Sequence, residues 1–277
     1  MRTYGCPDHE IADAICKRVS KPIEIDGRLD KAPWTKAVKS PRFVDMVTGE
    51  PGLYDTRAAA LWDDQNLYVA FWVEEPFVRA RATERDSYIF LEKDVEVFID
   101  GGDCYYEFEV NALGTIYEVF YIWRDAFTAH PERYLPEFDP VKRNALVFGG
   151  DWDRTGVDFW KGRHPRGLRW AYRDWDFPGV KCAVRVDGRI NDDSVVDRGW
   201  TVELAFPWAG MKTLTHGRTL PPQDGDVWRI LFGRFHLMSP SGIEVQPHPG
   251  WLWNRHGVYD THLPECFTRV HFSKETV

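Results

Sequence analysis

The chain has 277 residues, of which 43% are hydrophobic and 28% are charged. This length and composition support a sizeable core and exclude an intrinsically disordered protein. The formal net charge is −8, and no run of Lys and Arg exceeds two or three residues, which argues against a nucleic-acid-binding protein.

Residues 1–20 are a polar lead-in, in which Ile11–Val19 predicts a turn or two of helix. The lead-in contains no apolar segment of the signal-peptide type, and no part of the chain approaches the ~20 apolar residues that span a membrane. Five cysteines without a CxxC pair favour reduced thiols over a disulfide framework or a zinc site. We therefore expect a cytoplasmic protein without a membrane partner, or a secreted one if a signal has been removed from it.

The next segment predicts a short strand and a tight turn. Ile23 and Ile25 alternate as in a strand, and Asp26-Gly27 follows as a turn signal. A helical turn after it would pack Trp34 inward.

Residues 56–73 predict a β-hairpin around the polar turn 63–66. Alternation assigns the second strand two faces, one with Leu67, Val69 and Phe71, and the other with Tyr68, Ala70 and Trp72.

Residues 94–100 predict another strand, with Val95, Val97 and Ile99 on one face and Glu96 and Phe98 on the other. Residues 105–111 would pair with it after a Gly-Gly-Asp turn, and residues 115–123 predict the strand that follows.

Residues 124–179 are rich in Trp, Pro, Gly, Arg and Asp and lack clear periodicity. A stretch of this length inside one domain is usually an elaborated loop, so we expect an insertion over one end of the fold. Further segments predict strands at 180–186, 199–206, 226–236 and 267–272, and a short helix at 208–211. Many short strands without helices between them indicate an all-β sandwich or barrel, which we take as one domain over residues 1–277.

Several segments in order resemble the family 9 carbohydrate-binding modules, stand-alone relatives of which belong among DOMON-like β-sandwiches. These segments are IEIDGRLDKAPW (23–34), LWDDQNLYVAFWV (61–73), DVEVFID with FEVNALGT (94–115), DRGWTVELAFPW (197–208) and, more weakly, HLPECFTRVHF (262–272). The resemblance implies a jelly-roll-like antiparallel β-sandwich with a long Trp-rich loop insertion. It also implies a sugar held between two aromatic rings with acidic, amide and Arg side chains beside it.

The resemblance carries a site onto this sequence residue by residue. Glu96 matches the family's acid, Phe90 matches the aromatic residue six positions earlier, and Asn111 matches the amide. Glu109 stands where the family sometimes has Arg, and the second stacking ring aligns near Thr261. The expected ligand-binding residues are Phe90, Glu96, Glu109, Asn111, Arg234, Trp253, Tyr259 and His262.

A catalytic alternative depends on Glu96 and Glu109, which would face each other on adjacent strands. Paired carboxylates hydrolyse glycosides, and His262 with Asp260 and Glu265 would add acid–base chemistry. Two unrelated surface acids, or one acid paired with Arg234, explain the same pattern.

No cofactor is required by these residues. The acidic loop of Asn191, Asp192, Asp193 and Asp197 offers oxygen ligands for a structural calcium ion, and an exposed turn explains it equally well. The haem-binding relatives raise a further alternative, but Met46, Met211 and Met238 have no context typical of axial ligands.

The sequence thus predicts a carbohydrate-binding protein that recognises a mono- or oligosaccharide in an aromatic and acidic cleft. An enzyme acting on a sugar or glycoside through carboxylates is the alternative, and a haem-binding redox domain is the third reading.

Overall fold

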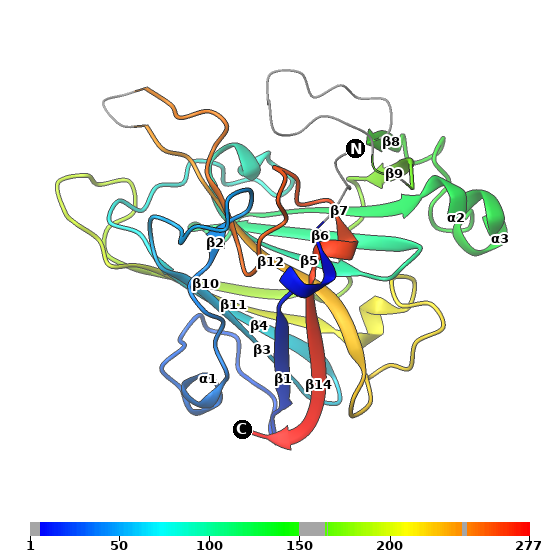
Figure 1. The fold of residues 1–277 in the computed structure, drawn as a ribbon, viewed down its shortest axis with the longest axis horizontal. Coiled ribbons are helices and arrows are strands. Elements are labelled where there is room, and N and C mark those ends of the chain that lie inside the picture. The colour runs from blue at the N-terminus through cyan, green and yellow to red at the C-terminus, as the bar shows by residue number, and fades with distance from the viewer. Residues whose placement is uncertain (1–5, 150–163, 165, 240–242) are drawn as a thin grey trace.

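The computed structural model describes residues 6–149, 164, 166–239 and 243–277. Within these residues, 14 strands join in one sheet that folds back on itself (Figure 1). Its path runs through β10 (Lys181–Asp187), β11 (Gly199–Pro207), β4 (Asn66–Glu74), β3 (Thr56–Trp62), β1 (Asp13–Arg18), β14 (Thr268–Thr276), β12 (Val227–His236), β5 (Lys93–Asp100), β6 (Cys104–Asn111), β7 (Ile116–Trp123), β9 (Leu168–Tyr172) and β8 (Leu146–Gly149). The short strands β13 (Gly250–Leu252) and β2 (Val44–Asp45) pair with each other beside β12.

The two halves of this path face each other across the main core. Phe71 of β4 lies 6.3 Å from Phe232 of β12, and Phe206 of β11 lies 5.4 Å from Phe108 of β6, measured between ring centroids. Side chains from both halves are fully buried between them, which is the arrangement of a β-sandwich. The sequence prediction of an all-β sandwich is therefore confirmed.

Strands β1 and β14 lie side by side and join the two halves (Figure 1). They pair in parallel from Asp13 with Arg269 to Cys16 with Phe272 and beyond. The predicted helix at Ile11–Val19 is wrong, because long-range pairing with the other end of the chain satisfies this segment's backbone.

Alternation was predictive for the central strands. In β4, Leu67, Val69 and Phe71 enter the main core, while Tyr68 and Ala70 pack in a smaller cluster on the opposite face. In β5 the valines and Ile99 likewise face the main core, and the even-numbered residues 94–100 face outward from the sandwich. The outward face of β5 carries the candidate site.

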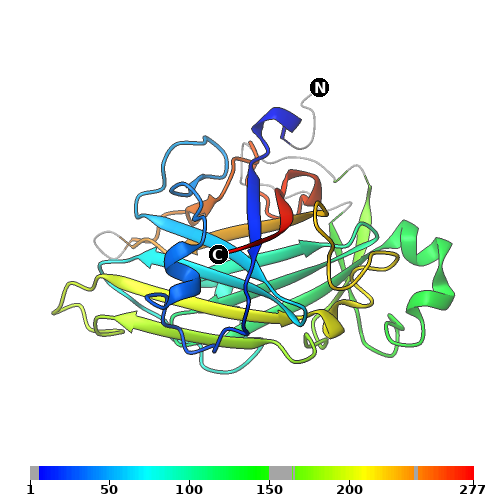
Figure 2. The same ribbon diagram turned by 90° about the horizontal axis from the view of Figure 1, so that it is seen from below.

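Few residues are helical. The α-helices are α1 (Ala32–Lys36), α2 (Arg124–Ala129) and α3 (Pro131–Tyr134), and the 3₁₀ turns are η1 (Asp8–Glu10), η2 (Ile89–Leu91), η3 (Trp208–Met211) and η5 (Pro264–Cys266). In Figure 1 and in Figure 2, α1 and the pair α2–α3 lie on opposite sides of the molecule. Among the described residues, no helix has the length and apolar character that crossing a membrane requires.

The turn expected at Asp26-Gly27 is present, but the short strand expected before it is not. Gly27 has φ +78°, and a Cβ there would lie 3.2 Å from the carbonyl carbon of Val184, so glycine is needed at this position. Trp34 of α1 is fully buried, as predicted, and its indole N–H donates to Glu203 at 2.6 Å.

The insertion 124–179 contains regular structure that its composition conceals. Its described part contributes α2, α3, β8 and β9, and β9 extends the sheet by pairing with β7. The alternation in β9 is short, and the Pro, Gly and Trp residues around it hide the pattern. Residues 150–163 and 165 of the insertion lie outside the described residues.

Candidate functional site

Four carboxylates lie on the outward face of β5 and β6. Because side chains alternate along a strand, Asp94 and Glu96 of β5 share this face with Glu107 and Glu109 of β6. Glu96 and Glu109 are direct partners across the two strands, as the sequence predicts. All four are at most 4% exposed, and we call them the acidic floor.

The acidic floor resists ionisation. Burial in a weakly polar environment raises the pKa of Asp94 to about 8 and that of Glu107 to about 7. Burial, with the neighbouring carboxylates, holds the pKa values of Glu96 and Glu109 well above their ordinary range. Glu107 accepts a hydrogen bond from the Tyr121 hydroxyl at 2.6 Å, which acts in the opposite direction.

Three oxygens of the floor have no hydrogen-bond partner: Oδ2 of Asp94, Oε2 of Glu96 and Oε2 of Glu109. Oxygens of these three side chains lie within 4.8 Å of one another. Buried carboxylate oxygens in proteins are almost always satisfied, so this arrangement makes the floor a candidate site.

Three aromatic rings lie at one edge of the acidic floor. Phe90 of η2 lies 5.4 Å from Tyr117 of β7 and 5.2 Å from Tyr88, the residue before η2. These three rings form an aromatic ladder that leads from the buried floor to Tyr88, which is 48% exposed. Flat exposed rings of this kind can stack on the apolar face of a sugar.

A cavity of about 840 Å³ opens beside the ladder. Its lining includes Tyr54, Phe77, Arg79, Tyr88, Lys93 and His236, and we call it the rim cavity. Tyr88 belongs to both the cavity and the ladder. The combination of aromatic rings with a few charged groups is typical of a small-molecule site.

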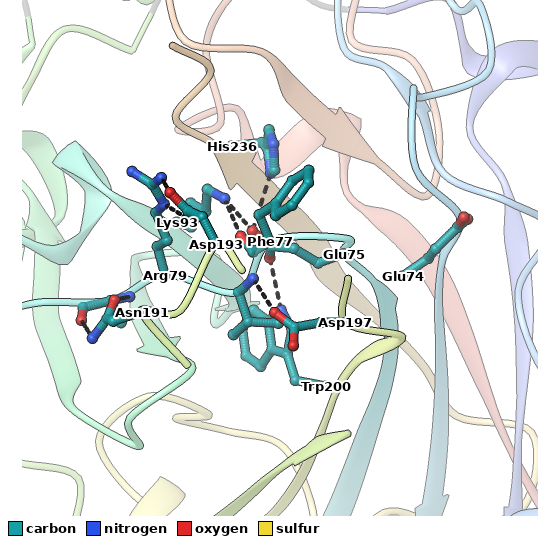
Figure 3. A network of polar contacts seen from close by, with 12 residues as sticks. Glu74, Glu75, Phe77, Arg79, Lys93, Asn191, Asp193, Asp197, Trp200 and His236 are labelled. Carbon is teal, nitrogen blue, oxygen red and sulfur yellow. Dashed lines mark hydrogen bonds and ion pairs between the residues drawn. The ribbon is translucent and has the colours of Figure 1, made fainter. Parts of the chain in front are cut away.

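One side of the rim cavity is held in place by a buried ionic network (Figure 3). Glu75 accepts hydrogen bonds from the Lys93 ammonium, from Nη2 of Arg234 at 3.2 Å and from the indole of Trp200 at 3.0 Å. Arg234 also donates to Nδ1 of His236 at 3.1 Å, which fixes that nitrogen as the acceptor. Burial lowers the pKa of Lys93, and Glu75 opposes this effect.

The predicted site residues divide between the two faces of the second half of the sheet. Phe90, Glu96 and Glu109 lie on the outward face, and Tyr259 packs there against Phe235 with ring centroids 5.9 Å apart. His262 lies there too, with Nδ1 3.0 Å from the Tyr105 hydroxyl and Nε2 3.9 Å from Glu107.

Three other predicted residues have different surroundings. Asn111 holds a turn, since its side-chain oxygen accepts from the backbone of Leu113 and Thr115. Arg234 bonds to Glu75 rather than to Glu96 or Glu109. Trp253 packs in the main core, with its ring 5.0 Å from Phe232.

The acidic loop considered for calcium has hydrogen-bond donors of its own. Asp197 accepts from the backbone of Val78 and Arg189, and Asp193 pairs with Arg79. Asp192 accepts from Ser194.

The expected acid–base partners of His262 are arranged differently. Asp260 accepts from the backbone N–H of His262, and Glu265 pairs with His164 at 3.1 Å.

Sequence reasoning missed Asp94, Glu107 and Tyr88, and it missed the Glu75–Lys93 pair. Asp94 and Glu107 could have been found by extending the alternation that singled out Glu96 and Glu109. Nothing in the sequence pairs Glu75 with Lys93, because they lie on separate segments that meet only in the fold.

Comparison with known proteins supports the resemblance seen in the sequence. A family model described as Carbohydrate-binding family 9 matches residues 55–146, about a third of the chain. This match confirms the resemblance and contains the strands that carry the acidic floor and the ladder. No curated protein sequence matches the chain.

Solved structures match the chain at low sequence identity. One from Bacteroides uniformis, whose description proposes that it binds carbohydrate, is 15% identical with a TM-score of 0.55 and covers 95% of this chain and 99% of its own. Two structures of a family 9 carbohydrate-binding module from Caldicellulosiruptor kristjanssonii also match over 95% of this chain. The complex with cellotriose is 13% identical with a TM-score of 0.48 over 95% of its chain, and the complex with glucose is 12% identical with a TM-score of 0.49 over 97%.

Proposed function

We propose that this protein binds a mono- or oligosaccharide, and that the sugar lies in the rim cavity against the aromatic ladder. The observation that carries the proposal is Tyr88, an exposed ring shared by the ladder and by a cavity of about 840 Å³. The cavity adjoins strands within the segment that matches Carbohydrate-binding family 9.

The chemistry of the rim cavity suits a sugar. Tyr54 and Tyr88 supply aromatic rings for C–H groups, and Arg173 packs over the Tyr88 ring. Arg79, Lys93 and Glu92 offer groups that reach hydroxyls. The cavity has the volume of a typical small-ligand site, so it accommodates one or two sugar rings.

Binding fits the geometry better than glycoside hydrolysis does. A glycosidase needs its two carboxylates on either side of the scissile bond, about 5–10 Å apart. Glu96 and Glu109 are nearly inaccessible, and their nearest oxygens lie within 4.8 Å of each other. A glycosidic bond does not fit between them, so we expect a bound sugar to be recovered unchanged.

The test is a panel of mono- and oligosaccharides, screened by thermal shift and measured by calorimetry. We expect Tyr88→Ala to weaken binding about tenfold, which is about 1.4 kcal/mol, because it removes a stacking face. Tyr88→Phe is the matched control, since it keeps the ring and should keep most of the affinity.

A second variant locates the sugar relative to the floor. Glu96→Gln should leave the affinity within about twofold if the sugar stays in the rim cavity. A large loss in Glu96→Gln with no loss in Tyr88→Ala would move the sugar onto the floor. No saturable binding across the panel would contradict the proposed function.

A further inference from the structure

The acidic floor gathers buried carboxyl groups, and ionising them would leave negative charge that no described cation contacts. Asp94, Glu96 and Glu109 are at most 2% exposed, and each has an oxygen without a hydrogen-bond partner. No nitrogen of a described Lys, Arg or His forms an ion pair with any of the three. Isolated buried carboxylates are costly, and proteins usually keep them only where they are paired or hold a metal.

Two arginines act on the floor through their charge, since Arg234 lowers the pKa of Asp94 and Arg169 lowers that of Glu107, but neither forms an ion pair with Asp94, Glu96 or Glu109. The guanidinium of Arg234 lies on the other face of the sheet, where it bonds to Thr56 and Glu75. Arg169 lies over the ring of Trp123, with its central carbon 4.6 Å from the ring centroid. Among the described residues, the floor therefore has no cation in direct contact with Asp94, Glu96 or Glu109.

The carboxyl groups of Asp94, Glu96 and Glu109 converge on one buried place in the fold. Oxygens of Asp94, Glu96 and Glu109 all lie within 4.8 Å, so one ion can contact all three side chains. Gly233 lies opposite Glu96 on β12, and a Cβ there would come within 3.1 Å of the free Oε2. Glycine at this position preserves room beside that oxygen.

The neighbouring backbone orients one of the ligands. The N–H of Phe235 donates to Oδ1 of Asp94 at 3.1 Å, which leaves Oδ2 free. The three side chains stand on adjacent strands that are hydrogen-bonded along their whole length, so the group is held rigidly. Rigid, buried oxygen groups of this kind are what a structural ion site requires.

We propose that Asp94, Glu96 and Glu109 bind one hard divalent cation of the calcium class in the floor beneath the aromatic ladder. The donor set contains only carboxylate oxygens, which suit Ca²⁺, Mg²⁺ or Mn²⁺ rather than zinc or copper. Calcium fits best, because three carboxylates supply up to six oxygens and calcium accepts irregular coordination at about 2.3–2.6 Å. The ion would neutralise the floor and hold together β5 and β6, the strands that η2 with Phe90 and β7 with Tyr117 adjoin.

The experiment uses the full chain stripped of metal with a chelator, in the absence of sugar. Calorimetry and thermal unfolding are followed as Ca²⁺ is added, and then as Mg²⁺ or Mn²⁺ is added. We expect one saturable site per chain and a rise in Tm on calcium binding. Glu96→Gln, Glu109→Gln and Asp94→Asn should each weaken calcium binding at least about tenfold, because each removes a charged ligand. Asp192→Asn, in the acidic loop between β10 and β11, is the control and should bind calcium as the wild type does.

Three results would overturn the proposal: no saturable binding of any of the three ions, unchanged affinity in Glu96→Gln, or loss of affinity in Asp192→Asn. If the floor variants do not fold, a crystal of the wild type grown with Mn²⁺ decides, because an anomalous peak must lie between the three carboxylates. The measurement contains no sugar, so its failure and the failure of the proposed carbohydrate binding are distinguishable.

Discussion

Glu75→Gln should lower the free energy of unfolding by about 3–5 kcal/mol. Among the described residues, Glu75 is the one carboxylate that contacts both Lys93 and Arg234, and all three side chains are buried. The amide keeps the shape but not the charge, so two cations stay buried without a counter-ion. Chemical denaturation, followed by tryptophan fluorescence at neutral pH, measures the loss.

The neighbouring residue provides a matched control. Glu74 is exposed, and its carboxylate accepts one hydrogen bond from the backbone of Asp55, which an amide oxygen also accepts. Glu74→Gln should therefore change the stability by no more than about 0.5 kcal/mol. Equal effects of the two variants would show that the Glu75 network contributes nothing beyond an ordinary surface charge.

The Glu75 network also bears on the rim cavity, because Glu75, Lys93 and His236 all line it. If Glu75→Gln folds, the loosened Lys93 side chain should disturb the polar wall against which a sugar would lie. Adding Lys93→Met to Glu75→Gln removes one uncompensated cation and should recover part of the lost stability. The double-mutant cycle of these two substitutions measures the interaction free energy between Glu75 and Lys93.

The sequence was most informative where the residue pattern of a single strand determines which side chains share a face. Residues 56–73 hold two runs of strand-forming residues around a polar turn, and in the hairpin β3–β4 the second strand has the predicted faces. The same logic placed Glu96 opposite Glu109. Local patterns carry this information because side-chain direction in a strand depends only on parity.

The parts of the fold and of the site that the sequence did not predict depend on contacts between distant segments. Residues 13–18 form a strand because residues 269–276 lie beside them, and nothing in their own composition says so. Arg234 and Trp253 were assigned to the cleft by position along the chain. The fold turns Arg234 toward Glu75 and packs Trp253 into the main core.

The acidic floor shows a different limit. A carboxylate in a strand is usually exposed, so alternation alone assigns Asp94 and Glu107 to solvent. Here, however, the outward face is covered by a second apolar cluster that includes Met46, Leu252 and Phe267. These residues come from distant loops and strands, and burial by such segments cannot be inferred from the strands that they cover.

His236 predicts how stability depends on pH. Its ring is 5% exposed, and burial lowers its pKa from 6.5 to about 2, with the charges of Arg234, Lys93 and His248 adding to the effect. Glu75 is the acidic group facing it, with Oε1 4.0 Å from Nδ1. The unfolded chain binds a proton here below pH 6.5 and the folded protein does not, so stability is lost as the pH falls.

The loss attributable to this group should reach about 2 kcal/mol at pH 5, since each pH unit below 6.5 contributes about 1.4 kcal/mol. The variant His236→Asn isolates the contribution of His236 to the pH dependence. Its amide oxygen can accept the hydrogen bond from Arg234 but cannot be protonated between pH 5 and pH 7.5. Denaturation of both proteins from pH 7.5 to pH 5 should show the stability difference shrinking by about 2 kcal/mol. The raised pKa values of the acidic floor and the lowered pKa of His256 are common to both proteins and cancel in the difference. Parallel curves would mean that His236 becomes protonated in the folded state, with the rim cavity opening to admit the proton.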